Sequence, residues 1–496
     1  MKRPHYPIIY VRGYAMTNGA IEETVADPYM GFNIGSTKLR HQYPKGVARH
    51  IFESPLVRLM KDEEYRDTFL DGSELASDTG TNAPPPDRAV WIYRYYESAS
   101  RELGTGDASD IEHYAKGLLD LINALHDHYV PGDRAARGRD TEAFRVYLVA
   151  HSMGGLICRC LLQQFSRNDP RIDKVFTYAT PHGGIDLRGV GNVPGFVGIA
   201  KADTFSESRM REYLKLPADA DVRSLDGAFD EERFFCLVGT NNDDYGMARF
   251  AVGGMSDGLV RINNAYALDT PRAFVHRSHS GHYGIVNSED GYQNLRRFLF
   301  GNVRVDAYLD IEAITLPDAI QKEKDQGRAI RADYLVDIIG RVRGTRWDLH
   351  RRTTAEGSAV VIDYDRHVKE HQPLHLASVF LSNDARQNTS RPSLGFSLDI
   401  RVHVPEYQVD KKLRLDDFHD GAHLFRDKIN LEAERSADGN WVVRYGWDSK
   451  TPNGVSQMAE ATQPMPGNWV FEIPVVQNSR PGLRATLRLE TRPWNE

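Results

Sequence analysis

A serine in the stretch LVAHSMGG, residues 148–155, is the side chain whose surroundings most clearly suggest chemistry. Ser152 has Ala150 two positions before it and Gly154 two positions after it. Small residues are needed there when a serine occupies a tight turn from a strand into a helix, because larger side chains would collide. Such a serine can act as a nucleophile if a histidine accepts its proton and a carboxylate orients that histidine. The alternative is a purely structural turn.

The segments on either side of Ser152 favour the nucleophile. FRVYLVA (144–150) has the β-branched and aromatic residues of a buried strand, and GGLICRCLLQQF (154–165) is apolar enough to be a buried helix. A turn between them would place Ser152 beyond the end of the sheet, at the start of the helix. The backbone N–H of Met153 would then be able to stabilise a tetrahedral oxyanion.

Two domains are expected from the pattern of elements along the chain. Up to residue 301, short strands alternate with helices at 111–129 and 289–300, which predicts a mostly parallel sheet covered by helices. After residue 301 apolar residues alternate with polar ones, as in 303–311 and 394–404, which predicts an antiparallel β-sandwich over 302–496. The strands expected in the first domain are 7–11, 89–96, 144–150, 174–179, 233–239 and 272–276.

Two long insertions interrupt the first domain. They span residues 14–88 and 185–232 and exceed ordinary loop lengths. Both leave the end of the sheet where Ser152 is expected, so we predict that they form a lid and an acyl pocket. Packing against the sandwich is the alternative.

The net charge, the cysteines and the lengths of the apolar runs limit the partners and the location that we expect. The net charge of −7 gives no general attraction to nucleic acid. The three cysteines do not suggest a disulfide framework or a metal site, and we expect buried thiols. The N-terminus has no apolar stretch typical of a signal peptide, and no run approaches the roughly 20 residues of a membrane span. We therefore expect a cytoplasmic protein, with signal-less export left open.

At the serine turn the chain resembles the α/β-hydrolase superfamily, and within it the bacterial lipases and related acyl-ester hydrolases. AHSMGG (150–155) is similar to the nucleophile elbow of small bacterial lipases, with alanine in place of the usual first glycine. YATPHGG (178–184) is similar to the segment after their next strand. The resemblance covers residues 7–300 and implies a mostly parallel sheet with helices on both faces. It also implies a triad in the order serine, acid, histidine, and we assign no metal or other cofactor.

The resemblance places the acid after the strand at 233–239. SDGLV (256–260) is similar to the acid-bearing segment of lipases, so we prefer Asp257. Asp243 and Asp244 are the alternatives, although a polar surface loop would also explain them.

The resemblance places the histidine after the last strand of the sheet. His282 in GHYGIV (281–286) precedes the last helix and has Ile285 three positions later, as lipases of this type often do. We therefore prefer His282 as the base and keep His279 as the second candidate.

The segment PIIYVRGYA (7–15) resembles the His-Gly-aromatic loop of lipases. This likeness implies that the backbone N–H of Tyr14 is the second oxyanion donor, beside that of Met153. Arg12 stands where lipases usually have histidine. Its guanidinium is either a paired structural group or a contact for an anionic substrate group such as a phosphate or carboxylate.

These residues predict a serine hydrolase that cleaves acyl esters, of the lipase or esterase kind and including a phospholipase variant, through an acyl-enzyme. Acyl transfer by the same chemistry is an alternative, and so is a catalytically silent hydrolase fold that serves as a binding module. The expected partners are an acyl ester or a lipid, with peripheral contact to a lipid surface allowed. By analogy alone, the sandwich would serve a lipid surface or a protein partner.

Overall fold

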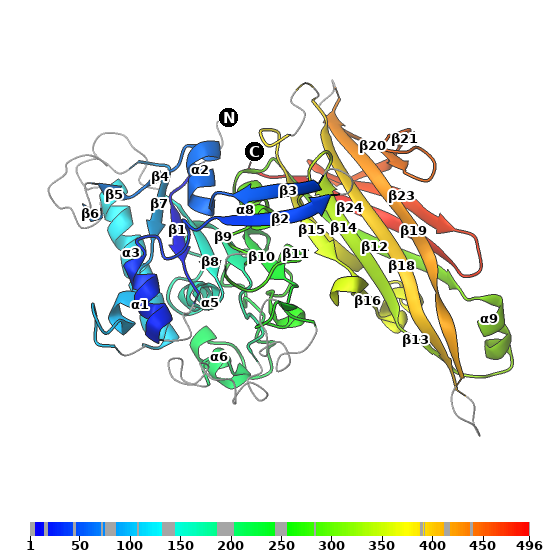
Figure 1. Ribbon diagram of the computed structural model, residues 1–496, viewed down its shortest axis with the longest axis horizontal. Helices are drawn as coiled ribbons and strands as arrows, with labels where there is room; N and C mark the ends of the chain where they lie inside the picture. The colour runs from blue at the N-terminus through cyan, green and yellow to red at the C-terminus, as the bar shows by residue number, and fades with distance from the viewer. Residues whose placement is uncertain are drawn as a thin grey trace. The chain divides into compact units, whose positions relative to one another are not determined.

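The computed structural model describes most of the chain (Figure 1). The described residues are 5–13, 18–42, 46–70, 73–74, 86–106, 109–130, 144–185, 203–243, 255–281, 284–386, 390, 392–410, 417–436 and 440–495. Two of the predicted site residues, Tyr14 and His282, lie outside these ranges. Contacts divide the chain into two compact units, one of residues 2–272 and 277–299 and one of residues 273–276 and 300–496.

One sheet has the strand order β11-β10-β9-β8-β1-β7-β4, which confirms the predicted α/β architecture. The pairings from β10 through β9, β8, β1 and β7 to β4 are parallel. Every residue of β1 and β8 is buried, as expected for parallel strands covered on both faces. The strands are β1 (Ile8–Val11), β4 (Arg66–Asp67), β7 (Ala89–Ile92), β8 (Val146–His151), β9 (Ile172–Tyr178), β10 (Phe234–Gly239) and β11 (Arg272–Val275).

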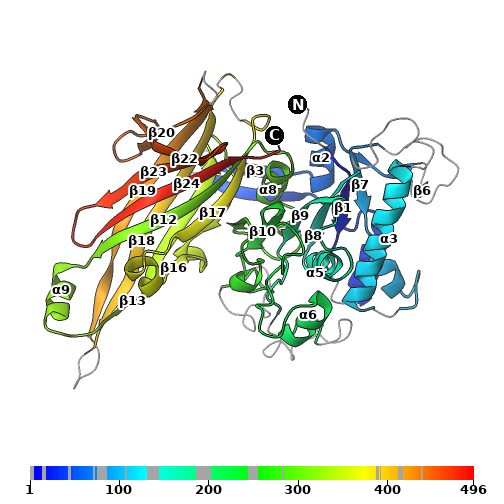
Figure 2. The ribbon, with the colours of Figure 1, turned by 180° about the vertical axis from the view of Figure 1, so that it is seen from behind.

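Helices flank this sheet, and Figures 1 and 2 show α3 and α5 side by side. All eight residues of α5 are buried, which agrees with its apolar sequence. The helices α3 and α8 have the predicted bounds. The helical segments are α1 (Asn18–Ala26), α2 (Pro55–Glu63), η1 (Tyr95–Ala99), α3 (Ile111–Tyr129), α5 (Met153–Cys160), η3 (Leu161–Phe165), α6 (Glu207–Leu214), η5 (Glu231–Arg233), η7 (Ile262–Asn264) and α8 (Glu289–Phe300).

The first insertion contains α1, α2 and two small hairpins. The longer hairpin joins β2 (Ser36–Gln42) to β3 (Gly46–Phe52), and the shorter one joins β5 (Phe69–Leu70) to β6 (Ser73–Glu74). Of the second insertion the structure describes residue 185 and residues 203–232, which include α6 and most of η5.

The second unit contains two antiparallel sheets, as the alternating pattern predicts. One has the order β17-β12-β24-β23-β22, and the other has the order β15-β14-β18-β19-β20-β21 with β13 on β18 and β16 on β14. The inward residues of β12 and β18, such as Leu309 and Ile400, join one core cluster. The elements are β12 (Val303–Thr315), α9 (Asp318–Asp325), β13 (Ile330–Ala332), β14 (Tyr334–Val342), β15 (His350–Arg352), η8 (Thr354–Glu356), β16 (Val360–Ile362), η9 (Tyr364–Lys369), β17 (Leu374–Leu381), β18 (Leu394–Val409), β19 (Asp417–Arg435), β20 (Trp441–Trp447), β21 (Gln457–Met458), β22 (Glu460–Met465), β23 (Asn468–Gln477) and β24 (Gly482–Pro493).

Two sequence expectations concern the whole chain. Cys158, Cys160 and Cys236 are free and buried, as predicted. None of the helices in the described ranges is both long and apolar enough to cross a bilayer.

Candidate active site

Ser152 occupies the turn between β8 and α5 with a strained backbone. Its φ of 52° and ψ of −126° lie outside the regions that non-glycine residues favour. Two hydrogen bonds hold it there: Ser152 N–H donates to the carbonyl of Tyr178 over 2.9 Å, and Thr180 Oγ1 donates to the carbonyl of Ser152 over 2.9 Å. The turn therefore presents a serine at the carboxyl end of a central strand, as a nucleophile elbow requires.

Two glycines allow the backbone to pack closely around this turn. A Cβ atom at Gly154 would lie 2.2 Å from the carbonyl oxygen of Val11. A Cβ atom at Gly13 would lie 2.5 Å from Cβ of Ser152. Only glycine fits at either position without a shift of the backbone, so the loop after β1 and the turn after β8 are in direct contact.

A histidine and an aspartate lie in line with Ser152. His279 Nε2 is 2.8 Å from Ser152 Oγ, and His279 Nδ1 is 2.9 Å from Asp257 Oδ2. Because a carboxylate only accepts, Nδ1–H donates to Asp257, which leaves Nε2 to accept the serine proton. All three side chains are buried. The arrangement has the geometry of a nucleophile, a base and an orienting acid.

Asp257 is held by the backbone of its own loop. Its Oδ1 accepts the N–H groups of Leu259 and Val260 at 3.0 and 2.7 Å. The N–H of His279 donates to the carbonyl of Asp257 over 3.0 Å, so main chain as well as side chain joins the two residues. The carboxylate therefore has hydrogen bonds on both oxygens and a fixed direction toward the imidazole.

The histidine in this position corrects our order of preference. The lipase-like spacing favours His282, but the imidazole between serine and aspartate is that of His279, and His282 lies outside the described residues. The main-chain bond to Asp257 fixes His279 at the correct point of the loop, and no sequence spacing reports such a contact. Of the alternative acids, Asp243 is exposed and Asp244 lies outside the described residues.

His151 is a site residue that the sequence reasoning missed. Its Nε2 donates to the carbonyl of His279 over 2.8 Å. Burial and the neighbouring His279 lower the pKa of His151 well below its ordinary value, so the ring is neutral. Its only sequence signal is its place directly before the serine. Its hydrogen bond anchors the backbone of His279.

Two tyrosines hold the loop that carries Arg12 and Gly13. Tyr95 donates its hydroxyl to the carbonyl of Arg12 over 2.8 Å, and Tyr96 donates to the carbonyl of Gly13. Burial raises the pKa of Tyr95 well above its ordinary value, so it stays a donor. These contacts explain why the predicted strand 89–96 ends at Ile92: both tyrosines lie in η1, where they reach this loop.

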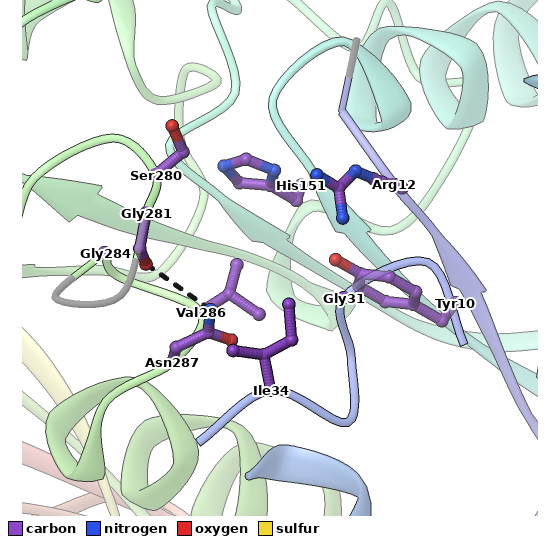
Figure 3. Close-up of a pocket in the computed structure, with 10 residues that line it drawn as sticks. All are labelled: Tyr10, Arg12, Gly31, Ile34, His151, Ser280, Gly281, Gly284, Val286 and Asn287. Carbon is purple, nitrogen blue, oxygen red and sulfur yellow. Dashed lines mark hydrogen bonds between the residues drawn. The ribbon is translucent and has the colours of Figure 1, made fainter. Parts of the chain in front are cut away.

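A pocket of about 140 Å³ opens beside His151 (Figure 3). Its wall includes Ile34 and Val286 on one side and the guanidinium of Arg12 on the other. Arg12 Nη1 donates to the carbonyl of Met30, and among the described residues no carboxylate pairs with Arg12. The other residues lining the pocket are Tyr10, Gly31, Ser280, Gly281, Gly284 and Asn287.

The sequence predicts two oxyanion donors, the backbone N–H groups of Met153 and Tyr14. Met153 is the first residue of α5, and the first N–H groups of a helix have no acceptor within it. Tyr14 lies outside the described residues. In the part of the chain that the structure describes, no three or more His, Cys, Asp or Glu side chains gather in a way that could hold a metal ion.

Comparison with known proteins gives one family match. The model of the PGAP1-like alpha/beta domain matches residues 99–188, which contain α3, β8, the serine turn and β9. No curated protein matches the chain in sequence.

Several solved structures are similar to the chain at low identity. Phospholipase PlaB from Legionella pneumophila is 13% identical over 84% of this chain and 91% of that chain, with a TM-score of 0.32. The metagenomic carboxyl esterase MGS0156 is 13% identical over 60% and 73%, with a TM-score of 0.27. The product of the gene lin2722 from Listeria innocua is 12% identical over 60% and 94%, with a TM-score of 0.26.

The match to an alpha/beta domain covers the serine turn after the central strand β8. The parallel sheet with its flanking helices has the hydrolase architecture, and the C-terminal unit adds antiparallel sheets to it. Residues 99–188 thus match the PGAP1-like alpha/beta domain, and the sheet around them has an α/β-hydrolase-like architecture.

Proposed function

We propose that this protein is a serine hydrolase that cleaves acyl esters with Ser152, His279 and Asp257. The observation that carries the proposal is the continuous line of hydrogen bonds from Ser152 Oγ through His279 to Asp257, at 2.8 and 2.9 Å. The strained backbone of Ser152 supports it, because such strain is typical of a nucleophile elbow and a structural turn does not need it.

The reaction would proceed in two halves through an acyl-enzyme. Ser152 Oγ attacks the carbonyl carbon of the ester while His279 Nε2 takes the hydroxyl proton, and Asp257 stabilises the imidazolium. The N–H groups of Met153 and Tyr14 hold the oxyanion of the tetrahedral intermediate. Collapse breaks the bond to the alcohol, which leaves with the proton from His279. Water then attacks the acyl-enzyme with His279 as base and releases the acid and the free serine.

The pocket is lined by His151 and Ser280, the chain neighbours of Ser152 and His279, and its lining suggests what kind of ester fits. Its aliphatic side suits an acyl or alkyl group, whereas Arg12 supplies a positive charge without a carboxylate partner among the described residues. A guanidinium that is only partly exposed is stabilised when a phosphate or carboxylate oxygen binds it. We therefore propose a lipid-like ester that carries an anionic group near the scissile bond.

Labelling with a fluorophosphonate tests the nucleophile directly. The probe phosphonylates an activated serine, so the wild-type chain should be labelled and Ser152→Ala should not. The matched control is Ser278→Ala, which removes a buried hydroxyl outside the proposed triad and should leave labelling intact. Labelling that persists in Ser152→Ala would refute the assignment, and a folded wild type without labelling would favour a catalytically silent hydrolase fold.

A further inference from the structure

The hairpin β2–β3 belongs to the first insertion and forms a separate two-stranded sheet. Its register pairs Thr37 with Ile51 and Leu39 with Arg49, and Val47 belongs to the pair two positions further toward the turn. Paired residues of an antiparallel sheet project from the same face, and so do alternate residues along each strand. Leu39, Val47, Ile51 and Arg49 therefore share one face of the hairpin.

That face exposes large aliphatic side chains. The exposed fractions are 62% for Leu39, 56% for Val47 and 61% for Ile51. A single exposed aliphatic residue is ordinary, but three on one face of a short hairpin form a contiguous apolar patch. Such a patch marks a surface that another apolar body covers.

The charge of the hairpin contrasts with that of the chain. Residues 36–52 contain Lys38, Arg40, Lys45 and Arg49 and no acidic residue, in a protein whose net charge is −7. Arg49 lies directly opposite Leu39, so a cation projects from the apolar face itself. A partner that complements this face is both apolar and negatively charged.

The segment that leads into the hairpin contributes to the pocket lined by His151 and Arg12. Ile34, two residues before β2, lines that pocket, and the Oγ of Ser36 donates to the carbonyl of Asn287 over 3.0 Å. Asn287 also lines the pocket (Figure 3). A body bound to the hairpin would thus meet the chain next to the entrance of the proposed substrate site.

We propose that the hairpin β2–β3 docks the enzyme on an anionic lipid surface. Leu39, Val47 and Ile51 would enter the boundary between head groups and acyl chains, while Arg49 on the same face would bind an anionic head group. A second copy of the chain fits less well, because two such hairpins would bring like charges together. The choice of lipid rests on the proposed function, whereas the apolar and basic character of the hairpin does not.

The test measures vesicle binding by the full-length chain with Ser152→Ala, so that no lipid is consumed. Vesicles are made of phosphatidylcholine alone or of phosphatidylcholine with phosphatidylglycerol, and bound protein is measured by co-sedimentation. We expect binding to the mixed vesicles, weakened at least about tenfold by Leu39→Ser with Ile51→Ser, since both changes remove aliphatic area from the interface. Arg49→Gln should weaken binding to the mixed vesicles and reduce its salt dependence.

The matched control is Val361→Ser with Val476→Ser, which removes two exposed aliphatic side chains from the second unit and should leave vesicle binding unchanged. Circular dichroism verifies that each variant is folded. Equal vesicle binding by the hairpin and control variants, or no binding by the parent, would overturn the proposal. So would loss of a dimer in the hairpin variant by light scattering, because a second copy would then be the partner.

A water-soluble short-chain ester separates this proposal from the proposed function. The hairpin variant with Ser152 intact should hydrolyse it at the wild-type rate, because such a substrate needs no surface. If vesicle binding occurs but no ester is cleaved by the wild type, the proposed function fails and the docking surface stands.

Discussion

The imidazole of His151 donates a hydrogen bond to the main-chain carbonyl of His279 over 2.8 Å. His151 directly precedes Ser152, so this bond links the strand that leads into Ser152 to the loop that carries His279. The lowered pKa of His151 keeps its ring neutral, and the Nε2 proton is committed to that carbonyl. The bond therefore holds the backbone of His279 close to the strand that leads into Ser152.

We predict that His151→Leu lowers kcat by roughly ten- to a hundredfold with little change in KM, because small displacements of catalytic groups cost rates of this order. The carbonyl of His279 would lose its hydrogen-bond donor. The imidazole of His279 would then no longer be held at a fixed distance from Ser152. His151→Gln, which can supply a donor, should recover part of the rate. Steady-state kinetics on a soluble ester measures both effects.

His350→Leu is the matched control for His151→Leu. His350 is also fully buried, and burial lowers its pKa to about 3, but it lies in the second unit. Its loss should reduce the free energy of unfolding without changing kcat. Equal losses of kcat in the two variants would show that His151 acts on stability alone.

A second prediction separates the two histidines of the loop after β11. His279→Ala should reduce kcat by about 10³-fold or more, as removal of a triad base does, whereas His282→Ala should reduce it far less. Fluorophosphonate labelling should slow in parallel with kcat in His279→Ala. If His282→Ala is the more damaged variant, the assignment of the base to His279 is wrong.

A third prediction concerns the charge in the pocket. Arg12→Gln should lower kcat/KM for esters with a phosphate or carboxylate near the scissile bond by roughly tenfold or more, which corresponds to loss of a charge-assisted hydrogen bond. Neutral esters of equal length should be affected much less. Arg12→Lys should retain part of the preference, since it keeps the charge but not the fork of donors. Equal effects of Arg12→Gln on both ester classes would contradict the anion contact.

A fourth prediction follows from a buried lysine on β9. Burial lowers the pKa of Lys174 to about 7 from its usual 10.5, although Asp173 lies 3.7 Å away. Between these two pH values the unfolded chain binds more protons than the folded one, so the free energy of unfolding rises with pH through this window. Below this pH window Lys174 is charged in the folded chain too, so the full cost of burying the charge lowers the free energy of unfolding.

Lys174→Met should therefore raise the free energy of unfolding by about 1–4 kcal/mol near neutral and lower pH. The gain should disappear at high pH, where the lysine is already neutral. Asp173 would not lose all its partners, because Arg145 lies 3.0 Å away and Arg233 also contacts it. Urea unfolding at several pH values measures how the free energy of unfolding changes with pH. The control Lys61→Met, at a mostly exposed lysine, should leave this pH dependence unchanged. A gain that is independent of pH would contradict this explanation.

The sequence alone was sufficient wherever the determining contacts are local. The apolar runs of β8 and α5 define a strand and a buried helix, and the small residue at Gly154 is needed within a few positions of Ser152. Alternating apolar residues likewise predict the antiparallel sheets of the second unit, because one face of each strand must be buried. The preference for Asp257 over Asp243 and Asp244 came from the likeness of the short segment SDGLV to the acid-bearing segment of lipases.

Tertiary structure alone decided which histidine lies beside Ser152 and what surrounds it. His279 and His282 are three positions apart, and the choice between them depends on contacts with Asp257 and with Ser152, which are 22 and 127 positions away from His279. The anchor from His151 and the cation of Arg12 in the pocket also need distant segments to be brought together. A linear pattern records neighbours along the chain, whereas a catalytic site is an arrangement in space that only the packed sheet and its loops create.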